Sequence, residues 1–213
     1  MELAKLISEI TVNETYFFRE FLQLQTFAEY ALKEVLSRKN NKVIKVLSAG
    51  CASGEEPYTI SIILNEMLDF QYSFKIDAID IDYKMIEIAK EGIYGQYAIK
   101  DIPGEYLERY FDKIDDERYR IKEVVRKNVN LYNLNLIEDR TYEILDEDYD
   151  FIFCRNVLIY FSDDIKRKLI ERFYIMLNEG GYIFLGHSES INRITSAFQI
   201  VKANDFILYR KPL

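Results

Sequence analysis

The sequence has few of the residues from which metal sites and disulfide frameworks are built. Its 213 residues include two cysteines and one histidine. The cysteines lack C-x-x-C spacing, so neither a disulfide framework nor a cysteine zinc site is indicated, and one histidine cannot build a histidine-rich metal site. We expect no metal ion, buried free thiols at Cys51 and Cys154, and a structural role for His187 at a strand end.

Long apolar runs and an excess of positive charge are also missing. No apolar run reaches the ~18 residues that would span a bilayer, and the N-terminus has no signal-peptide pattern. The formal net charge of −8 disfavours binding to nucleic-acid phosphates. We therefore expect a cytoplasmic protein without membrane insertion or a nucleic-acid partner, acting on a protein or a small molecule.

The composition that is present is typical of one α/β domain. Hydrophobic residues make up 49% of the chain and charged residues 30%, which is ordinary globular usage. The length suits one substantial core. We predict an N-terminal helical segment over residues 1–42 and an α/β domain over residues 43–213, with a β-rich insertion at about 94–132.

Apolar patterns predict the elements of that domain. Strands are expected at about 43–49, 74–80, 149–154 and 182–186, and helices after the first strand, at about 84–91, and from Asp163 to Leu177 with Ser162 as N-cap. Two further strand-like runs, 198–201 and 206–209, predict a terminal antiparallel hairpin on a mostly parallel sheet.

A loop of small residues follows the first predicted strand and opens a helix, over residues 49–57 (AGCASGEEP). Small residues such as Gly50 let the backbone approach a ligand closely. A helix start attracts anions, but Glu55 and Glu56 would repel a pyrophosphate there. They suit a ligand with ribose hydroxyls, an ammonium and a sulfonium, which describes S-adenosylmethionine. The alternative is a well-capped helix after a tight turn.

Polar residues end two further strands. Asp80 lies about 26 residues after the glycine loop, near the ~20-residue spacing at which an acid meets ribose hydroxyls in dinucleotide folds. Asp82 is the neighbouring candidate, but its place in the following turn predicts a helix N-cap. Arg155 and Asn156 end the fourth strand, where open α/β sheets bind ligands.

Five segments together carry a family resemblance. They are Thr11–Arg19 (TVNETYFFR), Ser48–Tyr58 (SAGCASGEEPY), Ala78–Asp82 (AIDID), Phe153–Phe161 (FCRNVLIYF) and Gly180–Ser190 (GGYIFLGHSES). In this order the set resembles the CheR-type chemotaxis receptor methyltransferases. The resemblance implies a class I methyltransferase fold, Rossmann-like, with a seven-stranded mostly parallel sheet. It also implies transfer of a methyl group from S-adenosylmethionine to glutamate side chains of bacterial chemoreceptors, leaving S-adenosylhomocysteine.

The resemblance also implies site residues. The cofactor would contact Asn13, Thr15 and Arg19 from the N-terminal side, Gly50 and Glu55 in the small-residue loop, Asp80 at the ribose, Asn135 and Leu136 at the adenine, and Arg155 and Asn156 at the methionine. Glu55 is preferred over Glu56 for the amino-acid end. Arg19 and Tyr160 would be catalytic, because they would position the substrate carboxylate.

Two features depart from the family pattern. Members commonly carry a helical domain ahead of the Thr-x-Asn block, whereas about ten residues precede it here. The turn within residues 111–118 lacks the extra glycines of members that bind a receptor's C-terminal pentapeptide. We therefore expect receptor cytoplasmic domains as partners, without pentapeptide tethering.

Other functions remain as alternatives. A non-catalytic S-adenosylmethionine-binding scaffold is disfavoured because both Arg19 and Tyr160 are present. A methyltransferase for another acidic substrate, a small molecule or nucleic acid is a second alternative; the acidic charge and the absence of an Asp/Asn-Pro-Pro-Tyr motif disfavour nucleic acid. An NAD-dependent oxidoreductase is disfavoured by Glu55 and Glu56.

Overall fold

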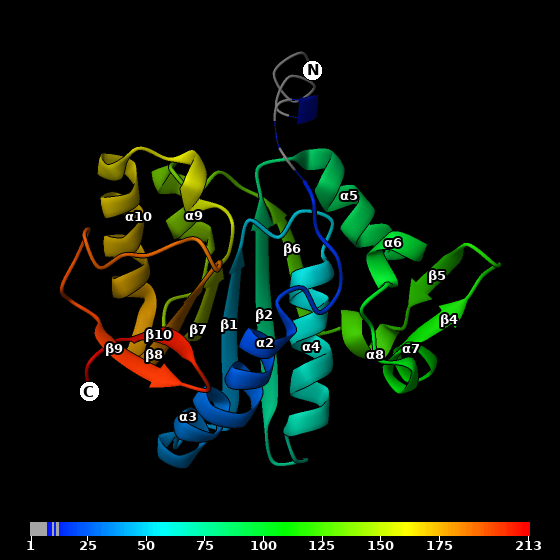
Figure 1. The fold of residues 1–213 in the computed structure, drawn as a ribbon, viewed down its shortest axis with the longest axis horizontal. Helices are drawn as coiled ribbons and strands as arrows, with labels where there is room; N and C mark the ends of the chain where they lie inside the picture. Colours follow the sequence, from blue (N-terminus) through cyan, green and yellow to red (C-terminus); the bar gives the residue numbers. More distant parts are fainter. Residues whose placement is uncertain (1–7, 10, 12) are drawn as a thin grey trace.

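The protein contains one large mixed sheet, shown in Figure 1 by a computed structural model that describes residues 8, 9, 11 and 13–213. The strand order is β6-β2-β1-β7-β8-β10-β9. The strands are β1 (Val43–Ala49), β2 (Ser73–Asp80), β6 (Val129–Asn133), β7 (Tyr149–Cys154), β8 (Leu177–Leu185), β9 (Gln199–Ala203) and β10 (Phe206–Arg210). β6, β2, β1, β7 and β8 pair in parallel, and β10 is antiparallel to both neighbours. The predicted sheet and terminal hairpin are confirmed.

Helices cover both faces of this sheet. One face carries α2 (Phe21–Thr26), the π-helix η1 (Phe27–Ala31), α3 (Leu32–Arg38), α4 (Glu55–Met67) and α5 (Tyr83–Glu91), and the other carries α9 (Asp139–Ile144) and α10 (Asp163–Met176). Successive strand residues point to opposite faces. Phe151 and Phe153 of β7 therefore join the core under η1, where both rings contact Phe27, while Ile152 joins the core under α10.

The segment before α2 differs from the expected helix. Residues 13–16 have no regular structure, residues 17–20 form a turn, and α2 begins at Phe21. Phe18 and Glu20 have φ values of 59° and 58°, a left-handed conformation that a right-handed helix cannot include. The part of the helical prediction that covers residues 1–7, 10 and 12 lies outside the described residues.

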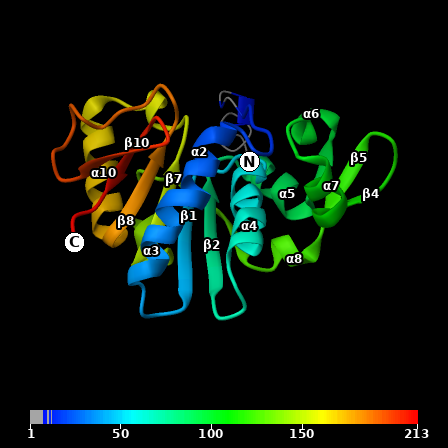
Figure 2. The ribbon, with the colours of Figure 1, turned by 60° about the horizontal axis from the view of Figure 1, so that its bottom comes forward.

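The expected insertion contains a small antiparallel sheet of order β3-β5-β4, formed by β3 (Ile93–Gly95), β4 (Phe111–Lys113) and β5 (Arg118–Ile121). Three short helices accompany it: α6 (Gln96–Ile99), α7 (Gly104–Tyr110) and α8 (Glu123–Arg126). The last residues of the predicted range, 129–132, instead belong to β6 at the edge of the main sheet. Figure 2 shows this insertion beyond α4, at the opposite end of the molecule from α10.

The insertion packs against the segment that precedes α2. The ring of Phe17 makes edge-on contacts with Tyr94 and Phe111, at centroid distances of 4.8 and 5.1 Å. The backbone N–H of Phe17 donates to the carbonyl of Ala98 (2.9 Å). These contacts join chain segments that lie far apart in sequence. Among the described residues, no helix is both long enough and apolar enough to cross a membrane.

Candidate functional site

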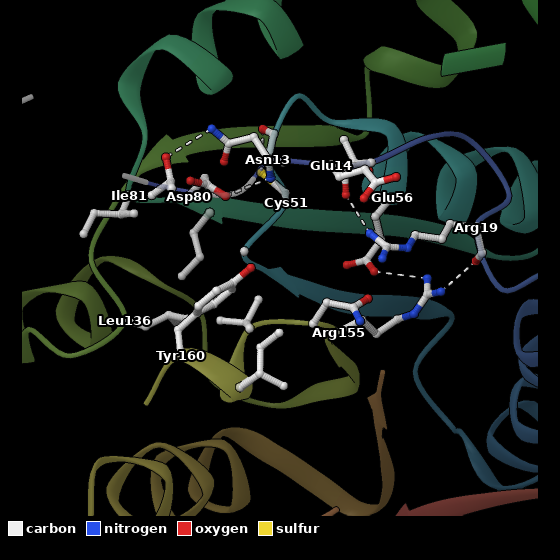
Figure 3. Close-up of a pocket in the computed structure, with 18 of the residues that line it drawn as sticks. Asn13, Glu14, Arg19, Cys51, Glu56, Asp80, Ile81, Leu136, Arg155 and Tyr160 are labelled. Atoms are coloured by element: carbon white, nitrogen blue, oxygen red, sulfur yellow. Dashed lines mark hydrogen bonds and ion pairs between the residues drawn. The ribbon is translucent and has the colours of Figure 1, made fainter. Parts of the chain in front are cut away.

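A cavity of about 600 Å³ lies at the carboxyl ends of β1, β2, β6 and β7 (Figure 3). This volume is in the range that holds a small molecule. The predicted site residues that line it are Asn13, Thr15, Arg19, Gly50, Asp80, Asn135, Leu136, Arg155, Asn156 and Tyr160. Gly50 has φ +87°, and a Cβ there would collide with Val157, so glycine lets the loop after β1 pack directly on the loop after β7.

The structure places Glu55 outside the lining of this cavity and Glu56 within it. Consecutive helix residues point about 100° apart, so only one of the two faces the cavity. Glu55 is 3% exposed and accepts a hydrogen bond from the hydroxyl of Ser53 (2.8 Å). Burial raises the pKa of Glu55 to about 7. The geometry therefore favours Glu56, rather than the expected Glu55, as the acid that meets a ligand.

Asp80 is fixed at the end of β2 by two backbone donors. Its Oδ2 accepts from the N–H of Ala52 (2.8 Å) and its Oδ1 from the N–H of Asp82 (2.8 Å). Burial raises the pKa of Asp80, and the backbone hydrogen bonds only partly offset this. Each carboxylate oxygen retains a further lone pair. Asp80 can therefore accept hydrogen bonds from a ligand's hydroxyl groups.

Arg155 connects three segments at the other end of the cavity (Figure 3). Its Nη1 pairs with Glu56 Oε2 (3.2 Å) and its Nη2 with Glu20 Oε2 (3.2 Å). Nη2 also donates to the backbone carbonyl of Arg19 (2.6 Å). Burial raises the pKa of Glu56 although Arg155 opposes the shift. Glu56 and Glu20 thus share one guanidinium, and the Glu56 carboxylate remains in the cavity lining, where an ammonium group of a ligand would meet it.

Apolar side chains form the remaining lining near Asp80. They are Ile79, Ile81, Leu134, Leu136, Ile137 and Val157. They provide an apolar slot for a flat ring. Sequence analysis identified only Leu136 among them, because an apolar residue at a strand end has the same sequence pattern as a core residue. It also missed Glu14, Tyr16 and Cys51, which line the cavity as well.

Residues 13–20, here called the N-terminal strap, form one wall of the cavity. One end is held by Asp82, which is fully buried and accepts from Asn13 Nδ2 (3.0 Å) and Thr11 Oγ1 (3.2 Å). Asp82 also accepts from the N–H of Lys84 (2.9 Å), which confirms its predicted role as the N-cap of α5. A single buried carboxylate thus anchors both a helix and the strap.

The insertion holds the middle of the strap. The ammonium of Lys100 lies 3.9 Å from the ring centroid of Tyr16 and 4.1 Å from that of Tyr97. The Tyr97 hydroxyl donates to the Glu14 carboxylate (2.8 Å). The wall of the cavity is therefore supported by residues from α6 and the residue that follows it.

Arg19 and Tyr160 bring a cation and a hydroxyl donor to the cavity. Arg19 Nη1 donates to the carbonyl of Glu14 (2.6 Å). Tyr160 is 59% exposed, and its hydroxyl points into the cavity in Figure 3. In the part of the chain that the structure describes, this hydroxyl has no hydrogen-bond partner. Both groups are placed where they could hold a carboxylate that enters from solvent.

Comparisons with known proteins agree with this geometry. Residues 13–207 match the family described as CheR methyltransferase, SAM binding domain. The chain is 39% identical to chemotaxis protein methyltransferase 2 of Vibrio cholerae, over 99% of this chain and 74% of the relative. It is 36% identical to a chemotaxis protein methyltransferase of Borreliella burgdorferi, over 90% of this chain and 69% of the relative.

Solved structures show the same fold. The crystal structure of DszA carbon methyltransferase superimposes with a TM-score of 0.50, at 15% identity, over 78% of this chain and 34% of that chain. The predicted class I methyltransferase fold is confirmed.

Proposed function

The chain belongs to the CheR methyltransferase family, and we propose that its cavity binds S-adenosylmethionine and exposes the methyl group to glutamate side chains of chemoreceptors. It is an S-adenosylmethionine-dependent methyltransferase of chemotaxis. One observation carries the assignment of the site. Two half-buried acids, Glu56 and Asp80, face the same cavity as Arg19 and Tyr160.

The lining residues fit the cofactor. Asp80 would accept the ribose hydroxyls, and the apolar slot around Leu136, with Asn135 beside it, would hold the adenine. Glu56 would accept the ammonium group, a role we assign to it instead of Glu55. The remaining contacts would come from Asn13 and Thr15 of the strap, from Gly50, and from Arg155 and Asn156. A buried acid whose pKa is raised is stabilised in its ionised form by a nearby cation, as the ligand would provide.

The chemistry needs few protein groups. Bound S-adenosylmethionine supplies a methyl group activated by a positively charged sulfur. A glutamate side chain with a pKa of about 4.3 is already ionised at neutral pH, so no general base is required. Arg19 would hold the carboxylate, and Tyr160 would donate one hydrogen bond to it. A carboxylate oxygen–carbon bond forms as the carbon–sulfur bond breaks, and the carboxylate loses its charge. Contacts that orient the carboxylate without binding it too tightly therefore favour the reaction.

We further propose that the enzyme acts in the cytoplasm, on the cytoplasmic domains of receptors. We also propose that it methylates them without capturing a receptor tail. The turn between β4 and β5 has no glycine over residues 114–117. Asp115 Oδ1 closes it by accepting from the N–H groups of Glu117 (3.0 Å) and Arg118 (2.8 Å). These contacts support a rigid turn. Capture of a receptor tail by β-augmentation would require the insertion to accept an added strand, and a rigid turn without glycine does not favour this.

The experiment is transfer of a labelled methyl group to receptor cytoplasmic fragments, scored as base-labile ester. We expect transfer by the wild type and slower transfer by Tyr160→Phe and Arg19→Ala, with Tyr160→Phe retaining its affinity for S-adenosylhomocysteine in calorimetry. Binding without any transfer would favour the scaffold alternative. If Tyr160→Phe transfers at the parental rate, Tyr160 has no catalytic role.

The tethering proposal is tested with paired substrates. A receptor fragment with its last residues removed should be methylated as fast as the intact fragment, and the free tail peptide should give no heat of binding. Micromolar peptide binding, together with loss of methylation on truncation, would contradict the proposal.

A further inference from the structure

Glu189 lies outside the cavity lining, yet its carboxylate binds the loop that carries two site residues. It follows β8 and is half-buried. Its Oε2 accepts from the backbone N–H groups of Gly186 (2.7 Å) and Asn156 (2.8 Å). Its Oε1 accepts from the N–H of Ile159 (3.3 Å). One side chain therefore joins the loop after β8 to the loop after β7.

The contact at Asn156 supports a left-handed backbone. Asn156 has φ 60°, a conformation that asparagine adopts more readily than most non-glycine residues but only as a single residue that its surroundings support. The two loops also approach closely, because a Cβ at Gly186 would lie 2.9 Å from the backbone nitrogen of Asn156 and 2.9 Å from Glu189 Oε2. The conformation that places Asn156 in the cavity lining thus depends on this carboxylate.

The contact at Ile159 sets the direction of Tyr160. Both residues belong to the short 3₁₀ helix η2 (Leu158–Tyr160). The first N–H groups of a helix have no partner within it, and Glu189 satisfies the one at Ile159. Since the Tyr160 hydroxyl makes no hydrogen bond within the described residues, the backbone of η2 decides where it points.

We propose that Glu189 is a positioning residue for methyl transfer, fixing the backbone that presents Asn156 to the cofactor and Tyr160 to the substrate carboxylate. This inference rests on the function proposed above. A carboxylate suits the task because both of its oxygens accept hydrogen bonds, whereas a glutamine offers one oxygen and turns an NH₂ group toward an N–H donor.

The test compares Glu189→Gln with Ser190→Ala. Ser190 lies in the same loop, but its hydroxyl contacts the Tyr209 hydroxyl (3.1 Å) and the N–H of Asn192 (3.3 Å) instead. Because small displacements of positioning groups slow a reaction strongly, kcat for a receptor fragment should fall about 10- to 100-fold in Glu189→Gln. Affinity for S-adenosylhomocysteine should fall less than kcat, and Ser190→Ala should retain both.

A double variant shows whether the effect passes through Tyr160. If it does, Glu189→Gln combined with Tyr160→Phe should be little slower than Tyr160→Phe alone, because coupled residues are not additive. A wild-type kcat in Glu189→Gln, or fully multiplied effects together with unchanged affinity, would overturn the proposal.

Two further measurements distinguish a failure of this proposal from a folding defect and from a failure of the proposed function. If Glu189→Gln does not fold, Glu189→Asp withdraws the carboxylate by one methylene; an intermediate kcat supports the proposal and a parental kcat overturns it. If the wild type methylates no receptor fragment, the proposed function fails on its own. The affinity of Glu189→Gln for S-adenosylhomocysteine then decides, and an unchanged value overturns the role of Glu189.

Discussion

The cavity has two sides that are built in different ways. Its floor consists of residues at the carboxyl ends of β1, β2, β6 and β7, which include Gly50, Asp80, Leu136 and Arg155. These positions are set by strand pairing, since β1 pairs in parallel with both β2 and β7. The N-terminal strap has no such ladder and depends on individual side-chain contacts. The difference indicates that strand pairing fixes the floor of the cavity, whereas a few side-chain contacts fix the strap.

The pKa values of the acids on the two sides also differ. Burial raises the pKa values of Glu55, Glu56 and Asp80 in or below the floor. At Asp82, which anchors the strap, burial acts in the same direction, but hydrogen bonds from Ser8, the Lys84 N–H and other donors lower its pKa overall. The strap anchor is thus already satisfied by protein donors, whereas Glu56 and Asp80 in the cavity lining keep raised pKa values that a nearby cation would lower.

The largest effect is expected at Arg155, because it joins the two sides. Arg155→Met would leave Glu56 and Glu20 without their cation and the carbonyl of Arg19 without its donor. Removing one partner of a buried ion pair costs about 3–5 kcal/mol. We expect a loss of this size in denaturant unfolding, and a smaller loss for Arg155→Lys. Equal stability of Arg155→Met and the wild type would show that the strap does not depend on this contact.

The floor and the strap also differ in how well the sequence predicts them. The floor was predictable because apolar strands end in polar residues at Asp80 and Arg155, and parallel strands bring such ends to one edge. The strap was not, because its turn depends on left-handed backbone at Phe18 and Glu20, and an aromatic-rich segment gives no local signal for that.

Two further details lay beyond sequence reasoning. Asn13 is held by Asp82, a residue 69 positions away, and no local pattern predicts such a pair. The choice between Glu55 and Glu56 depends on the rotation of α4 about its axis, which tertiary packing sets. Glu56 faces Ser48 and Arg155, whereas Glu55 is buried beside Ser53.

The second largest effect is expected at Glu55, which is buried outside the cavity lining, and it depends on pH. The pKa of Glu55 rises from 4.5 to about 7 on folding, so ionisation destabilises the fold as pH rises through this range. A shift of this size corresponds to about 3 kcal/mol above pH 7 and to nothing below about pH 4. We expect Glu55→Gln to be more stable than the wild type at pH 8 and equal to it at pH 4. Unfolding at both pH values measures this, with the exposed Glu143→Gln as control; equal stabilisation at both would contradict it.

The third effect tests whether the floor binds the ribose. Asp80→Asn removes the charge but keeps one acceptor oxygen, and hydrogen bonds to charged groups contribute about 1.5–3 kcal/mol. Affinity for S-adenosylhomocysteine should therefore fall about 10- to 100-fold in calorimetry. Asp82→Asn should weaken binding less, because Asp82 acts on the strap. The reverse ranking would transfer the ribose contact to Asp82.

The smallest effect is expected where the insertion supports the strap. Lys100→Met keeps an apolar chain between Tyr16 and Tyr97 but removes the cation over both rings. Cation–π contacts at exposed sites contribute about 0.5–1 kcal/mol, so unfolding should show a loss of that size, accompanied by slower methyl transfer because Tyr16 lines the cavity. Lys42→Met is the matched control, since Lys42 lies 4.5 Å from the ring centroid of Tyr72, outside the cavity lining. It should lose similar stability and keep full activity. If both variants keep full activity, the insertion contributes to the stability of the strap but not to the placement of the groups that transfer the methyl.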